Sequence, residues 1–236
     1  MAIEFKTAAE SATTHGIKSV VSGAAGTGKT TLVTTAPQPI CLMSAESGLL
    51  SIRNTKADIK IVEVKTIADI GAVLDHLEAK REFQTVAIDS ISEIGEIVLA
   101  NELERSADGR KAYGELNVKM MGILKAFRDL PGYNVLVTAK QERVQDDGGR
   151  FIYSPSMPGR QLALQLPYLF DLVMALRVVA DDKGNLNRWL QTGADTQYTA
   201  KDRSGKLEMF EEPNFNAVCE KILGKPVTPT KIAKAA

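Results

Sequence analysis

The most constraining feature of the chain is a short apolar strand, residues 17–22, that runs directly into a glycine-rich loop. Gly23, Gly28, Lys29 and Thr30 fill every fixed position of the pattern G-x-x-x-x-G-K-[ST]. The glycines let backbone N–H groups curl around a polyphosphate, and a helix that starts at the lysine aims its positive end at the same anion. We therefore expect a nucleoside triphosphate here, rather than a glycine-rich turn without a ligand. The residues expected to bind it are Gly23, Ala24, Ala25, Gly26, Thr27, Gly28, Lys29, Thr30 and Thr31.

The same loop predicts a metal ion beside the phosphates. Lys29 can reach the β- and γ-phosphates, and the Thr30 hydroxyl can hold Mg²⁺. Asp89 ends an apolar run, residues 85–89, and ligands of open α/β sheets bind beyond the carboxyl ends of the strands. A carboxylate there accepts hydrogen bonds from Mg²⁺-bound water and from Thr30. The alternative role of Asp89 is to cap the following helix. ATP and Mg²⁺ are the expected ligands.

Two further polar residues follow predicted strands. Ser90 comes directly after Asp89, at a position where many motor ATPases carry their catalytic glutamate, so the water-activating carboxylate must come from elsewhere. Glu46 ends the run 40–45 and is the candidate, because a strand end on the nucleotide side could bring it beside the γ-phosphate. Gln141 lies just past the run 135–139 and could sense the γ-phosphate. The alternatives are an exposed loop glutamate and an ordinary solvated glutamine.

Composition limits the fold more than the function. With 236 residues, 44% of them hydrophobic, the chain can bury one α/β domain, expected over residues 1–224. Residues 225–236 are basic and contain two prolines, which predicts a disordered tail. Lys plus Arg and Asp plus Glu both number 29, so the net charge is zero and no overall positive field indicates nucleic-acid binding. The isolated Cys41 and Cys219 fit no metal or redox spacing. We expect a soluble cytoplasmic protein, because no leader or membrane-spanning stretch is recognisable.

Strand-like and helical patterns alternate along the chain. Runs at 39–45 and 59–64 look like strands, and the continuous apolar runs at 85–89 and 135–139 are typical of strands buried on both faces of a parallel sheet. Helical spacing is found at 67–80, 93–104, 116–130 and 215–223. Runs at 172–179 and 188–192 flank a turn-rich segment, which predicts closing antiparallel strands. The fold class is therefore α/β with a mainly parallel sheet.

The chain resembles the RecA-like core of P-loop NTPases over residues 17–223. The resemblance rests on the order of the phosphate loop, Glu46, Asp89-Ser90, Gln141 and a later Lys-x-Arg pair. The chain is most similar to compact phage-encoded ATPases of the single-strand annealing group. The resemblance implies a three-layer α/β/α fold and rings or filaments with ATP at the subunit interfaces. It also implies that Glu46 activates water, Asp89 serves Mg²⁺ and Gln141 links nucleotide state to DNA binding. Lys201 and Arg203 resemble the pair that reaches into a neighbouring subunit's ATP, although a solvated basic strand edge is the alternative.

The resemblance further implies single-stranded DNA as a partner, held by two mobile loops at residues 105–113 and 143–160. Cations there can contact phosphates while aromatic rings stack on bases. The candidate DNA-binding residues are Arg105, Arg110, Lys111, Arg143, Arg150, Phe151, Tyr153 and Arg160. Further expected partners are copies of the same chain and a single-stranded DNA-binding protein, with no membrane involved. The expected location is the host cytoplasm if a phage encodes the chain.

Two other classes of function stay open. A nucleotide-gated regulatory or assembly ATPase would use the same core without DNA. A small-molecule kinase would use the same phosphate loop, with residues 143–160 as a lid. Glu46 and the Lys201–Arg203 pair would then have no role, so the kinase is the weaker alternative.

Overall fold

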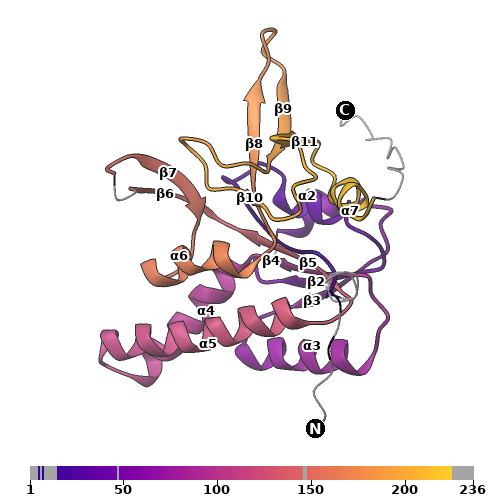
Figure 1. The fold of residues 1–236 in the computed structure, drawn as a ribbon. Coiled ribbons are helices and arrows are strands. Elements are labelled where there is room, and N and C mark those ends of the chain that lie inside the picture. The colour runs from indigo at the N-terminus through magenta and orange to yellow at the C-terminus, as the bar shows by residue number, and fades with distance from the viewer. Residues whose placement is uncertain (1–4, 6, 8–14, 47, 146–147, 225–236) are drawn as a thin grey trace.

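The computed structural model describes residues 5, 7, 15–46, 48–145 and 148–224, and these form three layers (Figure 1). The middle layer is a nine-stranded sheet in the order β11-β9-β8-β1-β5-β4-β2-β3, with β10 paired to β8. The strands are β1 (Lys18–Ser22), β2 (Ile40–Ser44), β3 (Ile59–Glu63), β4 (Thr85–Asp89), β5 (Asn134–Ala139), β8 (Leu172–Ala180), β9 (Leu186–Gln191), β10 (Lys201–Asp202) and β11 (Phe210–Glu211). The predicted three-layer α/β fold is confirmed.

Strand direction in the sheet follows the sequence pattern. The pairs β1–β5, β1–β8, β4–β5, β2–β4 and β2–β3 are all parallel, whereas β9, β10 and β11 pair antiparallel. All five residues of β1, β2 and β4 are buried, as expected for strands covered on both faces. The mainly parallel sheet and the antiparallel closing strands are both as predicted. The carboxyl ends of β1, β2, β4 and β5 therefore meet at one edge.

Helices cover both faces of the sheet (Figure 1). One face carries α3 (Ile67–Ala79), α4 (Ile91–Arg105), α5 (Gly109–Asp129) and α6 (Arg160–Leu169). The other face carries α2 (Lys29–Val33), the short 3₁₀-helix η1 (Leu49–Ile52) and α7 (Phe215–Leu223). A separate two-stranded hairpin, β6 (Gln141–Gln145) with β7 (Phe151–Pro155), extends away from the sheet.

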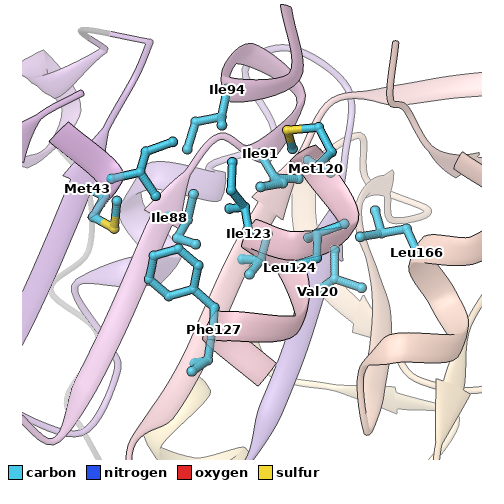
Figure 2. Packing of buried hydrophobic residues seen from close by; sticks show 14 of the residues in the cluster. Val20, Met43, Ile88, Ile91, Ile94, Met120, Ile123, Leu124, Phe127 and Leu166 are labelled. Atoms are coloured by element: carbon cyan, nitrogen blue, oxygen red, sulfur yellow. The ribbon is translucent and has the colours of Figure 1, made fainter. Parts of the chain in front are cut away.

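The larger of the two hydrophobic clusters lies between the sheet and α3–α6. Figure 2 shows Phe127 and Leu124 of α5 packed among Ile88 of β4 and Val20 of β1. The side chains of all four are at most 1% exposed. Apolar residues recur along α5 at helical spacing, so one face of that helix is buried against the sheet. This packing holds the strands, and with them the strand ends, in place.

Two predicted loops have regular structure instead. Residues 105–113 contain the last residue of α4, a short connection, and the first turn of α5, where Asp108 caps the helix by accepting from the Arg110 N–H at 2.9 Å. Residues 143–160 contain most of the β6–β7 hairpin and the start of α6. The prediction of loops was therefore wrong for most of both segments, which are helix and strand. The turn residues 146–147 and the predicted tail 225–236 lie outside the described residues.

Candidate nucleotide site

The phosphate loop connects the end of β1 to the start of α2. A Cβ atom on Gly23 would come within 2.6 Å of the Thr27 hydroxyl and 3.0 Å of the Leu176 carbonyl oxygen, so only glycine fits there. Gly28 has a φ of 101°, in the left-handed region that favours glycine. Ala24, Ala25 and Gly26, at the outer side of the loop, are exposed. The glycines of the pattern therefore have the geometric role that the sequence predicts.

Lys29 points back over this loop. Its ammonium group donates hydrogen bonds to the carbonyl oxygens of Gly23 at 2.9 Å and Ala24 at 3.1 Å. Partial burial lowers the pKa of Lys29, while the nearby carboxylates of Glu46 and Asp89 act in the opposite direction. Lys29 lies on the first turn of α2 with Thr30 and Thr31, and Thr31 is exposed. A phosphate anion would give this cation a stronger acceptor than the two carbonyls.

The structure brings Thr30 and Asp89 together from α2 and β4. The Thr30 hydroxyl donates to Asp89 Oδ2 at 2.6 Å, and the Thr138 hydroxyl of β5 donates to Asp89 Oδ1 at 2.5 Å. Asp89 is only 3% exposed. A hydroxyl and a carboxylate are hard oxygen donors of the kind that Mg²⁺ takes, usually together with water and substrate phosphates. Thr30 and Asp89 therefore fit a magnesium site. The cap of α4 is Ser90, not Asp89, which leaves the Asp89 carboxylate free of the capping role.

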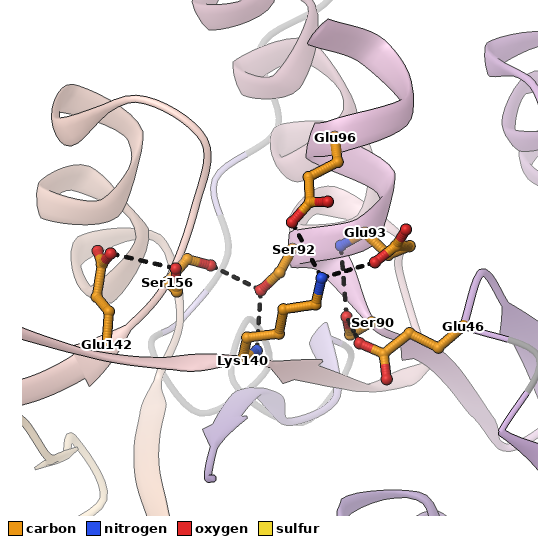
Figure 3. A network of polar contacts seen from close by, with 8 residues as sticks. All are labelled: Glu46, Ser90, Ser92, Glu93, Glu96, Lys140, Glu142 and Ser156. Atoms are coloured by element: carbon orange, nitrogen blue, oxygen red, sulfur yellow. Dashed lines mark hydrogen bonds and ion pairs between the residues drawn. The ribbon is translucent and has the colours of Figure 1, made fainter. Parts of the chain in front are cut away.

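Glu46 follows β2 at the same sheet edge and is exposed. Its Oε1 accepts a hydrogen bond from the Ser90 hydroxyl, which also accepts from the Glu93 N–H at 3.4 Å. Ser90 therefore orients Glu46 while it caps α4, as Figure 3 shows. A carboxylate that is exposed to solvent and held from one side can accept a proton from water or orient it. The position suits the predicted water-activating role.

Gln141 begins β6 and lines a cavity of about 300 Å³ beside the phosphate loop. The lining residues are Ala24, Ala25, Gly26, Thr27, Gln141, Leu176, Arg177, Val178 and Tyr198. Gln141 Nε2 is buried and has no hydrogen-bond partner within the described part of the chain. A buried amide donor without a partner is costly, so a bound acceptor such as a phosphate oxygen would satisfy it.

Lys140, which sequence reasoning missed, fixes the base of the hairpin next to Gln141 (Figure 3). Its ammonium group binds Glu93 at 2.7 Å and Glu96 at 3.0 Å, both on α4. These hydrogen bonds raise the pKa of Lys140 above its usual range. Its backbone N–H donates to Ser92, also on α4, at 2.9 Å. A lysine directly after an apolar strand was the available signal.

The β8–β9 hairpin lies next to the phosphate loop and contacts it. Strand β8 pairs with β1 only as far as Ala175, and its remaining residues extend past the sheet edge (Figure 1). Arg188 of β9 donates from Nε to the Thr27 carbonyl oxygen at 3.0 Å. This contact joins residues 161 positions apart in the sequence. The turn-rich segment in the sequence predicted the hairpin, but no local sequence pattern predicted that the hairpin would contact the phosphate loop.

A family model described as "AAA domain" matches residues 15–204, which include the loop, Glu46, Asp89 and Gln141. The chain belongs to this AAA domain family. The match supports a nucleotide-binding, ATPase-type domain and agrees with the mixed α/β fold. A comparison with curated proteins finds no match. The narrower resemblance to phage annealing ATPases stays a prediction.

The predicted trans pair of this AAA domain does not lie at its own phosphate loop. Lys201 pairs with Val173 near the amino end of β8, and its ammonium group donates to the Pro167 carbonyl oxygen at 2.5 Å. Arg203 donates to the Tyr168 carbonyl oxygen at 3.0 Å and to Asp171 at 3.3 Å. Both cations therefore contact the end of α6, and Arg203 also the α6–β8 connection, away from the strand ends that form the site.

The candidate DNA-binding residues of the AAA domain fall into two separate groups. The first lies at the end of α4 and in the first turn of α5 and comprises Arg105, Arg110 and Lys111. The second is on the β6–β7 hairpin and at the start of α6, and comprises Arg143, Arg150, Phe151, Tyr153 and Arg160. Of these, Arg143, Phe151 and Tyr153 share one face of the hairpin, because Arg143 pairs with Tyr153 and Gln145 with Phe151. Within the described residues, no helix is both long and apolar enough to cross a bilayer.

Proposed function

We propose that the protein is a Mg²⁺-dependent ATPase that binds single-stranded DNA and promotes annealing of complementary strands as a homo-oligomer. The observation that carries the proposal is the position of Gln141. Its side chain lines the cavity at the phosphate loop, and the same strand continues into the exposed β6–β7 hairpin. One strand, β6, therefore connects the nucleotide site to a hairpin that carries Arg143, Phe151 and Tyr153.

The residues of the site suit hydrolysis of a terminal phosphate. Lys29 and the loop amides would hold the phosphates, and Thr30 with Asp89 would hold the metal, whose charge neutralises the transferring group. Glu46, held by Ser90, would orient the attacking water and accept its proton. Gln141 would donate to a γ-phosphate oxygen through the Nε2 that otherwise has no partner.

The hairpin supports nucleic acid more than a small acceptor molecule. Arg143 lies over the Phe151 ring, with its guanidinium carbon 4.1 Å from the ring centroid, and Phe151 is 51% exposed. A guanidinium and an exposed ring suit phosphate contact and base stacking without sequence choice. Lys201 and Arg203 contact their own chain away from its phosphate loop, so in this proposal they would serve a nucleotide on another copy of the chain.

The test measures ATP hydrolysis with and without single-stranded DNA, and annealing of two labelled complementary oligonucleotides. We expect DNA to stimulate hydrolysis, and Lys29→Ala to abolish it. Lys56→Ala is the matched control, because it removes one lysine charge at an exposed position before β3, at the opposite end of the strands. If hydrolysis is slow and its rate does not change when DNA is added, and if no annealing is seen, the DNA role is refuted and a regulatory ATPase is favoured. Phosphoryl transfer to a small acceptor would favour a kinase.

A further inference from the structure

A group of aromatic side chains, some of them in contact with one another or with Arg177, begins on the β6–β7 hairpin. Tyr153 of β7 stacks on Tyr198, with ring centroids 5.0 Å apart and an interplanar angle of 27°. Backbone hydrogen bonds fix this contact, from the Tyr153 N–H to the Gln197 carbonyl oxygen at 2.6 Å and from the Thr199 N–H to the Tyr153 carbonyl oxygen at 2.9 Å. The hairpin is therefore anchored, at Tyr153, to the segment between β9 and β10.

The group continues onto the β8–β9 hairpin. The guanidinium carbon of Arg177 lies 4.3 Å from the Tyr198 ring centroid and 5.7 Å from that of Phe210. Arg177 pairs with Trp189 across the β8–β9 ladder, so both side chains lie on one face of this hairpin. Arg177, Trp189, Phe210 and Val179 line a cavity of about 380 Å³. We call Phe151, Tyr153, Tyr198, Arg177, Phe210 and Trp189 the aromatic strip.

We infer that the exposed rings of the aromatic strip, Phe151, Phe210 and Trp189, form a platform on which bases of single-stranded DNA stack, while Tyr153 and Arg177 cover the ring of Tyr198 between them. The inference rests on the proposed function and adds residues of the β8–β9 side, which no motif of the sequence singled out. Aromatic and guanidinium planes accept the face of any base, so such a platform binds without reading sequence. Three of its rings keep a large exposed area, at 51% for Phe151, 42% for Phe210 and 39% for Trp189.

The charges beside the strip indicate that stacking, more than phosphate attraction, carries the binding. Arg177 is partly neutralised by Asp195 at 3.7 Å and donates to Gln191 at 2.7 Å. These contacts engage the guanidinium within the chain, which leaves less of its charge and fewer of its donors for a phosphate. The chain has no net charge, so no overall field adds to the affinity. Binding should therefore depend on the presence of bases.

Trp189 makes the inference directly measurable, because it is the only tryptophan of the chain. The experiment titrates the full chain with a thymine oligonucleotide and with an abasic oligonucleotide of equal length and charge, following tryptophan fluorescence and, separately, the anisotropy of labelled DNA. We expect the thymine oligonucleotide to quench Trp189. We expect the abasic strand to bind at least about fivefold more weakly, the smallest loss for one stacked base.

Single substitutions test whether the side chains of the aromatic strip, and not neighbouring residues, contribute to DNA affinity. Phe210→Ala and Trp189→Ala should each weaken binding of the thymine oligonucleotide about fivefold or more, whereas Trp189→Phe, which keeps a ring, should restore most of it. Leu186→Ala is the matched control: Leu186 is an exposed apolar residue on the same strand, but it points to the opposite face. Its affinity should not change.

The outcomes distinguish the inference from the proposed function. DNA that binds without quenching Trp189, or equal affinity for the thymine and abasic strands, would overturn the aromatic strip while DNA binding stands. A chain that binds neither oligonucleotide, by anisotropy or by fluorescence, would overturn the proposed function as well. Quenching by the thymine strand that Leu186→Ala retains and Phe210→Ala weakens would support the platform.

Discussion

Replacing Asp89 by asparagine removes one charge from the site and leaves the shape of the side chain almost unchanged. Asp89 accepts from Thr30 at 2.6 Å and from Thr138 at 2.5 Å, and it is only 3% exposed. An amide can accept one of these hydrogen bonds and must donate toward the other hydroxyl oxygen. Since a hydrogen bond to a charged group contributes about 1.5–3 kcal/mol, Asp89→Asn should lower the free energy of unfolding by about that amount, and the protein should still fold.

The effect on the metal should be larger than the effect on folding. Partners that orient a metal site typically change metal affinity or activity by about 10- to 100-fold, so Asp89→Asn should weaken Mg²⁺-dependent nucleotide binding and slow hydrolysis by at least that factor. Without Mg²⁺, the affinity for ATP should stay the same or rise, because a negative charge next to the phosphates is gone. This opposite response with and without the metal identifies the role of Asp89.

The assay is binding of a fluorescent ATP analogue across a Mg²⁺ titration, repeated in excess chelator, with hydrolysis measured alongside. Thr138→Val is the control, because it removes the second hydroxyl from the carboxylate but keeps the charge and the Thr30 contact. It should cost stability and leave the Mg²⁺ dependence in place. If Asp89→Asn keeps the wild-type Mg²⁺ midpoint within twofold, the assignment of the metal to Thr30 and Asp89 is wrong.

Three further predictions follow from the same geometry. Glu46→Gln should bind ATP as the wild type does but hydrolyse it about 100-fold or more slowly, as loss of a general base predicts; unchanged turnover in a steady-state assay would remove Glu46 from the mechanism. Arg203→Ala should reduce hydrolysis at protein concentrations where the chain assembles, with ATP affinity of the dilute chain unaltered; equal loss at all concentrations would contradict a role in trans. Burial lowers the pKa of Lys18 to about 8 even though Asp171 acts to raise it. Between pH 8 and 10.5 the unfolded chain therefore holds a proton that the folded chain lacks, and stability should rise with pH relative to Lys18→Met, by up to about 3 kcal/mol in denaturant unfolding. A difference between the two proteins that does not vary with pH would contradict the lowered pKa.

The strand ends could be predicted because parallel pairing brings them to one edge. The apolar runs ending near Ser22, Ser44, Asp89 and Ala139 are short, uninterrupted and separated by helical patterns, which predicts a parallel sheet with all four ends together. Once the phosphate loop is placed at one of these ends, the polar residues at the others become neighbours. The sequence predicts this much of the site without knowledge of the strand order.

The two loop predictions failed for different reasons: one overlooked a local helix signal, and the other involves contacts between residues far apart in the sequence. Residues 105–113 were predicted to be a loop from the resemblance, yet the apolar spacing of α5 extends back to Ala112, and Asp108 acts as its cap. That signal was present in the sequence. The β6–β7 hairpin forms by local antiparallel pairing, but its position depends on hydrogen bonds between Tyr153 and the residues Gln197 and Thr199, far along the chain. Residues that distant cannot be paired from one sequence, and the contact of Arg188 with the phosphate loop was missed for the same reason.

The base of the hairpin and the phosphate loop also share an electrostatic link. Lys140 is held by Glu93 and Glu96, and its positive charge contributes to the lowered pKa of Lys29. Ser92 and Ser156 join the same base to α4 through short hydrogen bonds, as Figure 3 shows. An anion at the loop therefore acts on an element that also positions the hairpin. If that anion shifts the hairpin's affinity for a ligand by some factor, linkage requires the ligand to shift nucleotide affinity by the same factor. Nucleotide affinity measured with and without DNA should then show the same coupling as DNA affinity measured with and without nucleotide.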